Sequence, residues 1–166
     1  MRKNIIYSLL LVVAALFAGC ESRLDIAKHG NMGGQDDFYQ TDEQTEQAVA
    51  SMYSSLKGLY YNWFFTKNLL SDDVWCGGGQ RGDNTSLEQL NEYTYGTDNG
   101  MIQGVFSGLY GLIYQSNLVI EKVADDTPVK KRAIAEAKFF RAWANFELVT
   151  LWGTAPPVSY THLRAH

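Results

Sequence analysis

The most informative segment of the 166-residue chain is Ile134-Ala-Glu-Ala-Lys-Phe-Phe-Arg-Ala-Trp-Ala-Asn-Phe-Glu-Leu-Val149. Its apolar residues recur at steps of three or four, which is the spacing of one face of an α-helix. Upstream, Thr127-Pro128 has the form of an N-cap followed by proline at the first helical position. Downstream, Gly153 and Pro156-Pro157 stop the pattern. Together these signals predict a helix over residues 128–152.

Two further helices are predicted on the N-terminal side of this one. Residues 99–124 carry apolar side chains at helical spacing, with Asp98 expected as the N-cap. A helix over about 42–60 begins at Thr41-Asp42-Glu43-Gln44, which has the form of a capping box. Because no segment alternates apolar and polar residues as a strand would, we predict an all-α fold. The last two helices should form an antiparallel hairpin similar to a tetratricopeptide unit.

A long irregular loop over residues 71–98 separates the first helix from this hairpin. Its glycines favour turns, and only Glu88 to Tyr95 has the pattern of a short helical turn. A connection of this length in a compact domain is usually functional or mobile. Just before the loop, the apolar run from Trp63 to Leu70 could end the first helix or form a turn of its own. Tyr60, Tyr61 and Trp63 are expected in the core.

The loop carries side chains suited to sugar recognition. An aromatic ring can stack on the apolar face of a sugar, while carboxylates, amides and guanidinium groups bond its hydroxyls. The candidate ligand-binding residues are Trp75, Asp72, Asp73, Arg81, Asp83 and Asn84, with Gln80 beside them. The alternative is a solvated loop whose Trp75 packs on the core.

The N-terminal end has the pattern of a lipoprotein signal. Arg2 and Lys3 precede an apolar run that is too short to span a membrane, and small residues lead to Cys20. We expect a signal peptide over 1–19, lipidation of Cys20 and a tether over 20–40. The alternative is an ordinary secretory signal in which Cys20 is incidental.

At the other end, residues 158–166 can be back-translated into a sequencing adapter. We therefore interpret the biological sequence as ending at about Pro157, which leaves 41–157 as an incomplete helical domain. Under this interpretation His162 and His166 are not metal-ligand candidates.

Charge and composition exclude several classes of function. Setting aside Arg2, Lys3 and Arg164 leaves 11 basic residues against 18 acidic ones, a net charge of −7. That balance argues against nucleic acid as a partner. With Cys20 acylated, Cys76 is expected to be a half-buried thiol without a disulfide partner. We expect no metal and no cofactor.

An enzyme would have to use the loop carboxylates. Asp72, Asp73 and Glu88 are the residues that a glycoside hydrolase could employ. Such enzymes need two carboxyl groups at a defined separation, and adjacent residues in an irregular loop do not set one. We therefore predict that the protein is not an enzyme.

Four blocks of the sequence resemble the SusD/RagB family of surface nutrient-binding lipoproteins. They are Leu24-Asp25-Ile26 with Phe38 to Gln44, Ala48 to Tyr53, Leu109 to Ile120, and Ile134 to Pro157. The most specific features are Asn117 ahead of an apolar run and Glu136-Ala-Lys-Phe-Phe-Arg141. The resemblance covers about 21–157 and implies the N-terminal part of a considerably longer protein.

The resemblance implies a function. Members of this family lie on the outer membrane, bind oligosaccharides or in some cases peptides, and deliver them to a SusC-like TonB-dependent transporter. Asn117, Glu136, Arg141 and Trp143 carry the family signature, and we expect them to be structural, with Glu136 and Arg141 each pairing to a neighbouring helix. The alternative function is a helical-repeat scaffold lipoprotein that mediates protein–protein interaction in the envelope.

Overall fold

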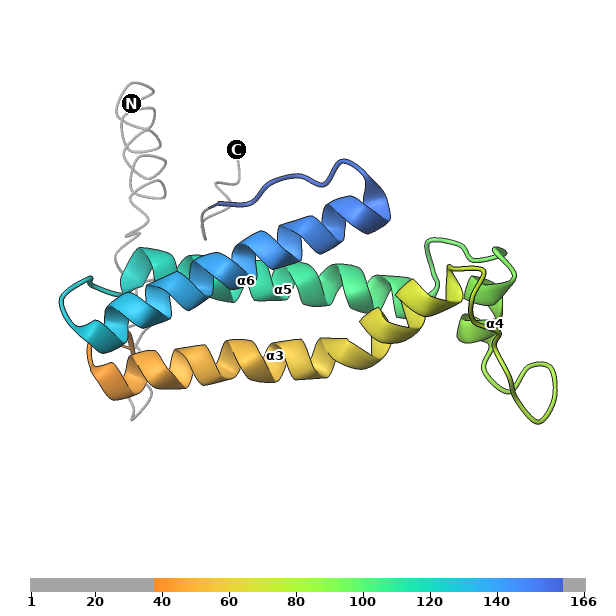
Figure 1. The fold of residues 1–166 in the computed structure, drawn as a ribbon, viewed down its shortest axis with the longest axis horizontal. Helices are drawn as coiled ribbons and strands as arrows, with labels where there is room; N and C mark the ends of the chain where they lie inside the picture. Colours follow the sequence, from red (N-terminus) through yellow and green to blue (C-terminus); the bar gives the residue numbers. More distant parts are fainter. Residues whose placement is uncertain (1–37, 160–166) are drawn as a thin grey trace, which may run out of the picture. The chain divides into compact units, whose positions relative to one another are not determined.

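The computed structural model of the protein describes residues 38–159, and this part is all-α (Figure 1). The predicted signal peptide, the predicted lipidation site at Cys20 and most of the predicted tether lie outside the described residues. The helices are α3 (Asp42–Leu69), α4 (Thr85–Asn91), α5 (Gly100–Lys122) and α6 (Pro128–Trp152). The predicted fold class is confirmed.

Helix α3 begins where its capping box predicts. The Thr41 hydroxyl accepts a hydrogen bond from the Gln44 backbone N–H, and the Gln44 side chain accepts one from the Thr41 backbone N–H. The helix continues to Leu69, past the predicted end near residue 60, so of the two alternatives for the apolar run from Trp63 to Leu70 the one that ends the first helix is confirmed. The extension has a physical cause, since Leu59, Thr66 and Leu69 keep one face buried at helical spacing.

Helix α5 begins one residue later than predicted. Asn99, not Asp98, is the N-cap, and its Oδ1 accepts from the backbone N–H groups of Met101 and Ile102 at 3.0 and 3.4 Å. The amide nitrogen of Asn99 donates to the Ser86 carbonyl, which ties the start of α5 to α4. Asn can do both because it carries an acceptor and a donor, whereas an Asp carboxylate only accepts.

Helix α6 has the predicted bounds. The Thr127 hydroxyl accepts from the Lys130 N–H, and Pro128 occupies the first turn, where its missing N–H costs no hydrogen bond. Gly153 ends the helix with φ of 74°, a left-handed conformation that favours glycine.

Helices α3, α5 and α6 pack on one another, with α5 antiparallel to both others (Figure 1). The core draws on all three helices. Its buried apolar members include Met52 and Leu59 of α3, Val105, Leu109, Leu112 and Ile113 of α5, and Ala137, Phe140, Ala144 and Leu148 of α6. Gly108 lets α5 approach α3 closely, since a Cβ there would lie 2.8 Å from Cδ1 of Leu59.

A second, smaller cluster holds α4 at the end of this assembly. Leu87 and Leu90 of α4 are buried against Leu69 of α3 and Met101 of α5. Tyr93, directly after α4, donates its hydroxyl to the Leu70 carbonyl at 3.2 Å. The loop that follows α3 is thereby attached to the helical core at both of its ends.

The segment after α6 folds back over the hairpin. Tyr110 donates its hydroxyl to the Pro156 carbonyl at 3.1 Å, and the Asn117 amide donates to the Val158 carbonyl at 3.1 Å. Arg141 Nη1 in turn donates to Oδ1 of Asn117 at 3.0 Å. Asn117 is 1% exposed, so this chain joins α6, α5 and the exit segment through a buried amide.

The structure tests the prediction that Arg141 and Glu136 each pair with a neighbouring helix. Arg141 of α6 hydrogen-bonds to Asn117 of α5, as predicted. Glu136 pairs within its own helix, with Nε of Arg132 at 3.5 Å, and also with a neighbouring helix, as predicted, through a side-chain hydrogen bond with Tyr53 of α3. That carboxylate raises the pKa of Tyr53, because a second negative charge beside it is unfavourable.

None of the helices between residues 38 and 159 is both long and apolar enough to cross a membrane.

Candidate functional site

One face of α4 holds the loop that precedes it. Glu88, Asn91 and Glu92 follow the three- and four-residue spacing that places side chains on the same side of a helix. Glu88 Oε1 accepts from the Gly82 N–H at 2.7 Å, and Asn91 Oδ1 accepts from the Cys76 N–H at 3.0 Å. Glu92 binds the Arg81 guanidinium. The irregular loop is therefore hydrogen-bonded to a short helix that is itself anchored by Leu87 and Leu90.

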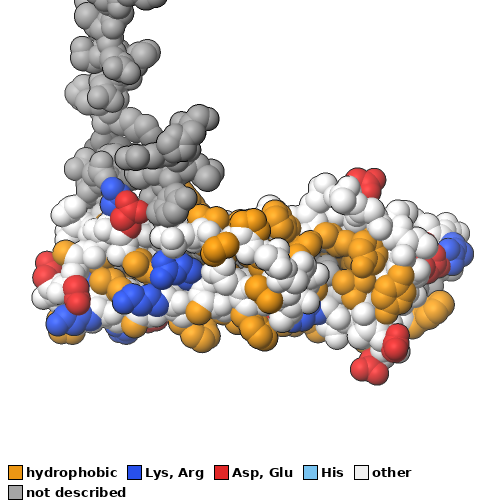
Figure 2. All heavy atoms as spheres, turned by 90° about the horizontal axis from the view of Figure 1, so that it is seen from above, with side chains coloured by type: hydrophobic (Ala, Val, Ile, Leu, Met, Phe, Trp, Pro, Cys, Tyr) orange, Lys and Arg blue, Asp and Glu red, His pale blue; other side chains and the backbone are white. Residues whose placement is uncertain are grey.

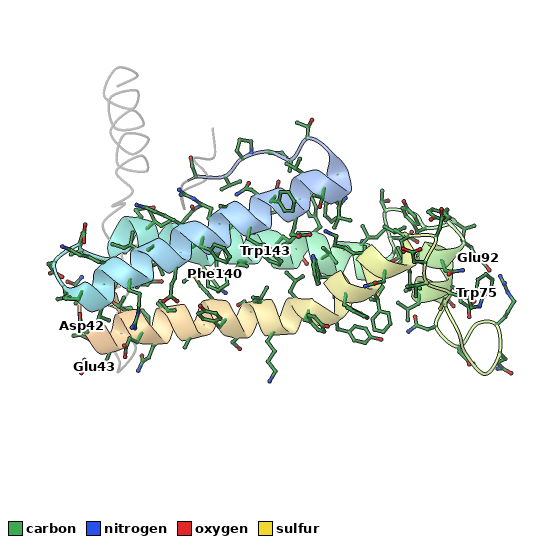
Figure 3. The ribbon with its side chains drawn as sticks, in the orientation of Figure 1. Asp42, Glu43, Trp75, Glu92, Phe140 and Trp143 are labelled. Atoms are coloured by element: carbon green, nitrogen blue, oxygen red, sulfur yellow. The ribbon has the colours of Figure 1, made fainter. Side chains whose placement is uncertain are left out.

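Between α4 and this loop lies a pocket of about 240 Å³. Its lining residues are Trp75, Cys76, Gly77, Gly78, Gln80, Arg81, Glu88, Asn91 and Glu92. Trp75 is 78% exposed and is thus a broad apolar surface in water beside a set of polar groups. Figure 3 shows Trp75 and Glu92 together at the α4 end, opposite the start of α3.

The pocket includes only part of the predicted site. Trp75 and Arg81 line it, whereas Asp72 and Asp73 are exposed outside its wall. Asp83 and Asn84 have local structural roles. Asp83 Oδ2 accepts from the N–H groups of Gly79 and Gln80, and Asn84 caps α4 by accepting from the Leu87 N–H. Short polar side chains at turns often hydrogen-bond to nearby backbone groups. The sequence alone does not distinguish this role from ligand binding.

Three lining residues are not among the predicted ligand-binding residues. The sequence offers Glu88 only as a possible catalytic carboxylate and as the start of a helical turn, and it predicts no ligand role for Asn91 and Glu92. The available signal was their shared helical spacing, which becomes meaningful only once α4 is known to start at Thr85.

Electrostatics in the pocket are dominated by one ion pair. Arg81 donates from Nη1 and Nη2 to the two carboxylate oxygens of Glu92, at 2.5 and 3.0 Å. These hydrogen bonds raise the pKa of Arg81 and lower the pKa of Glu92. Cys76 is half-buried, as predicted. Its burial is the main cause of a raised thiol pKa, and the negative charges of Glu88 and Glu92 raise that pKa further.

The aromatic residues before the loop are distributed differently from the prediction. Tyr60 and Tyr61 are 56% and 54% exposed, so their predicted place in the core was wrong. Trp63 does pack against the core, and its ring lies 6.1 Å from that of Trp143. Trp75, which could have packed on the core, does not.

Exposed aromatic residues also line a groove between α3 and α6. This groove of about 270 Å³ is bounded by Leu56, Leu59, Tyr60, Trp63, Phe139, Phe140 and Trp143. Phe139 is 67% exposed, and Phe140 and Trp143 are labelled on α6 in Figure 3. On the face drawn in Figure 2, hydrophobic side chains also gather along much of the helical assembly. The groove offers few polar groups, so it suits an apolar contact better than a hydroxylated ligand.

A larger hollow of about 510 Å³ lies near the end of α6. It is lined by Thr66, Leu70, Tyr95, Gly96, Thr97, Ile102, Leu151 and Trp152. No charged side chain lies in this wall. The smaller Trp75 pocket, where an exposed ring and several hydrogen-bonding groups meet, is therefore the candidate functional site.

A buried polar cluster near the groove was not foreseen. Glu147, which is 4% exposed, accepts from Nε1 of Trp63 and from Nζ of Lys67, each at 2.8 Å. Lys67 also lies 5.6 Å from the centre of the Trp63 ring. Burial of a carboxylate requires such partners, so this cluster fixes the C-terminal half of α3 on α6.

Within residues 38–159, no group of three His, Cys, Asp or Glu side chains is arranged to hold a metal ion.

Comparison with known proteins supplies the family. A SusD-like family model, described as starch-binding and associating with the outer membrane, matches residues 31–164. A SusD-like protein of Bacteroides ovatus is 32% identical over 160 residues, which is 88% of this chain and 28% of the relative. A SusD-like protein of Formosa agariphila is 26% identical over 155 residues, which is 93% of this chain and 30% of the relative. A second one is 26% identical over 129 residues, which is 75% of this chain and 26% of the relative.

The chain thus spans less than a third of the length of these curated relatives. No solved structure matches it significantly.

Proposed function

The chain belongs to the SusD-like family, and we propose that its protein is a cell-surface lipoprotein that binds oligosaccharides and delivers them to a TonB-dependent outer-membrane transporter. The family description, starch-binding and associating with the outer membrane, supports glycan binding at that membrane. In this proposal the protein binds its ligand and performs no chemistry on it.

One observation carries the proposal, namely the pocket beside Trp75. A ring that is 78% exposed stands next to the polar side chains of Arg81, Glu88 and Glu92. Sugars present apolar faces edged by hydroxyl groups, so a flat ring beside carboxylates and a guanidinium matches both features. The bonds from α4 to Gly82 and Cys76 hold this loop in place before a ligand arrives.

The membrane attachment rests on sequence features. In this proposal Cys20 is acylated after removal of residues 1–19, and residues 20–40 tether the helical domain. More than one acyl chain is needed for stable anchoring, which a fully acylated N-terminal cysteine would provide. Metabolic labelling with a fatty-acid analogue should mark the wild-type protein and leave Cys20→Ala unlabelled.

Glycan capture is tested by a binding panel. The full-length protein, prepared without its lipid, is titrated with soluble oligosaccharides of several backbone types. Binding of at least one oligosaccharide at sub-millimolar concentration is expected. If no oligosaccharide of the panel bound at millimolar concentration, glycan capture would be rejected.

The α3–α6 groove favours the second candidate, a helical scaffold that binds another envelope protein. Exposed rings such as Tyr60 and Phe139 are typical of protein contact surfaces. A comparison of two variants distinguishes the two functions. A scaffold would lose its partner on Phe139→Ser and keep it on Trp75→Ala, while glycan capture would respond only to Trp75→Ala.

A further inference from the structure

The charge around the Trp75 pocket bears on which glycans it can hold. Residues 71–98 contain six carboxylate side chains and a single cationic one, a net charge of −5. The carboxylates are Asp72, Asp73, Asp83, Glu88, Glu92 and Asp98, and the cation is Arg81. An anionic ligand that approaches this loop therefore meets a field of its own sign.

The single cation is already engaged. Arg81 forms a bidentate pair with Glu92 and uses the forked edge of its guanidinium. That same edge is the one with which arginine recognises carboxylate and sulfate-like groups. To bind an anionic sugar, Arg81 would have to leave Glu92, and the Glu92 carboxylate would then face the ligand unpaired.

The hydrogen-bond donors and acceptors of the pocket also favour a neutral ligand. Ionised Glu88 and Glu92 only accept hydrogen bonds, and Glu88 uses part of its capacity on the Gly82 N–H. Sugar hydroxyls donate well to carboxylates, and such charge-assisted bonds are the stronger kind. Carboxylate and sulfate groups on a ligand bring further acceptors and negative charge, and the one cationic side chain among the lining residues, Arg81, already gives two N–H groups to Glu92.

We infer that the Trp75 pocket takes neutral oligosaccharides and rejects those that carry carboxylate or sulfate groups. The inference rests on the proposed function, because it assigns a ligand class to the same pocket. Trp75 supplies the stacking surface, Glu88 and Glu92 accept from the hydroxyls, and the Arg81–Glu92 pair keeps the guanidinium from serving as an anion receptor.

Matched pairs of ligands test the inference. The full-length protein is titrated with galacturonan oligosaccharides in methyl-esterified and de-esterified form, and with neutral glucan oligosaccharides and their sulfated forms. Each pair shares a backbone and differs in charge. We expect the charged form to bind about tenfold more weakly at low salt, since each 1.4 kcal/mol corresponds to a factor of ten. The difference in affinity between the neutral and the charged form should decrease when added salt shortens the screening length to about 8 Å.

A double variant with Glu88→Gln and Glu92→Gln should also reduce the difference in affinity between the neutral and charged forms. The control variant Glu46→Gln on distant α3 should leave that difference unchanged. Equal or tighter binding of the charged form, lost in Trp75→Ala, would overturn the inference and leave glycan capture standing. Absence of binding by every member of every pair would reject the proposed function and the inference with it.

Discussion

At the residue scale, the structure separates side chains that serve the backbone from side chains that face solvent. Asp83 and Asn84 looked equivalent to Arg81 in the sequence, but the first two bond nearby backbone N–H groups. Trp75 could have been core or ligand surface, and its 78% exposure is set by tertiary placement. The chemistry of the loop was therefore predictable from residue types, while the membership of the pocket required α4.

Cys76 lies in the wall of the same pocket, so the reactivity of its thiol tests the environment there. Burial and the charges of Glu88 and Glu92 raise the pKa of its thiol, so less of the reactive thiolate is present at a given pH than for a free cysteine. With Cys20 replaced by Ala, alkylation at pH 8 should be slower than for a short cysteine peptide, and its rate should rise through a higher midpoint. Removing both negative charges with Glu88→Gln and Glu92→Gln should lower that midpoint. A midpoint equal to that of the peptide would contradict the placement of Cys76.

The ion pair between half-buried Lys67 and buried Glu147 should contribute more to stability than an exposed pair. Lys67→Met leaves the Glu147 carboxylate with only Trp63 as partner, and we expect a loss of about 1–3 kcal/mol in the free energy of unfolding. Arg132→Met is the matched control, because Arg132 and Glu46 are both exposed, and it should cost less than about 1 kcal/mol. Urea unfolding measures both. Equal losses would show that the Glu147 site is not desolvated in solution.

At the element scale, local signals predicted the start of α3 and both ends of α6. The Thr41 capping box, Thr127-Pro128 and Gly153 each act within one turn, so their effect is visible in the sequence. The sequence leaves open whether α3 extends to Leu69, because the last turns of this helix are stabilised by contacts with α6 and α4, as the bond from Trp63 to Glu147 illustrates. The Asn99 cap was missed for a similar reason, since its second bond goes to α4.

The close approach of α5 to α3 gives a paired prediction. Replacing glycine by alanine inside a helix normally gains about 0.5–1 kcal/mol. Gly111→Ala should show this gain, since nothing lies within 4 Å of the new Cβ. Gly108→Ala should instead lose about 1–2 kcal/mol, because its Cβ would press on buried Leu59 at 2.8 Å. Thermal or urea unfolding of both variants decides, and a stabilised Gly108→Ala would contradict the observed packing of α5 on α3.

At the scale of the whole molecule, the sequence predicted the helical hairpin and its family, but not how α3 lies against it. That arrangement depends on contacts far apart in the chain, such as the hydrogen bonds between Ser55 and Gln115. The aromatic groove between α3 and α6 follows from the same arrangement. The sequence does not predict this groove, because it favours Tyr60 as a core residue.

The exposed phenylalanine rings of α6 predict how residues 21–157 behave when expressed alone. Exposed rings such as Phe139 and Phe146 should bind a hydrophobic dye and favour association. Phe139→Ser with Phe146→Ser should lower dye binding, while Tyr93→Ser at the α4 end should change it little. Strong cooperative melting without dye binding would contradict the view that this surface is open to solvent.

The central claim is that the protein captures glycans through the Trp75 pocket. Calorimetric titration of the full-length protein with its best neutral oligosaccharide tests it most directly, with wild type compared against Trp75→Ala and against Tyr61→Ala as an exposed aromatic control. By analogy with the stacking of bases on aromatic rings, Trp75→Ala should weaken binding by about 1–3 kcal/mol, roughly 5- to 150-fold. Tyr61→Ala should leave affinity unchanged, and neither variant should shift the melting temperature appreciably. Equal affinity for wild type and Trp75→Ala would contradict the account.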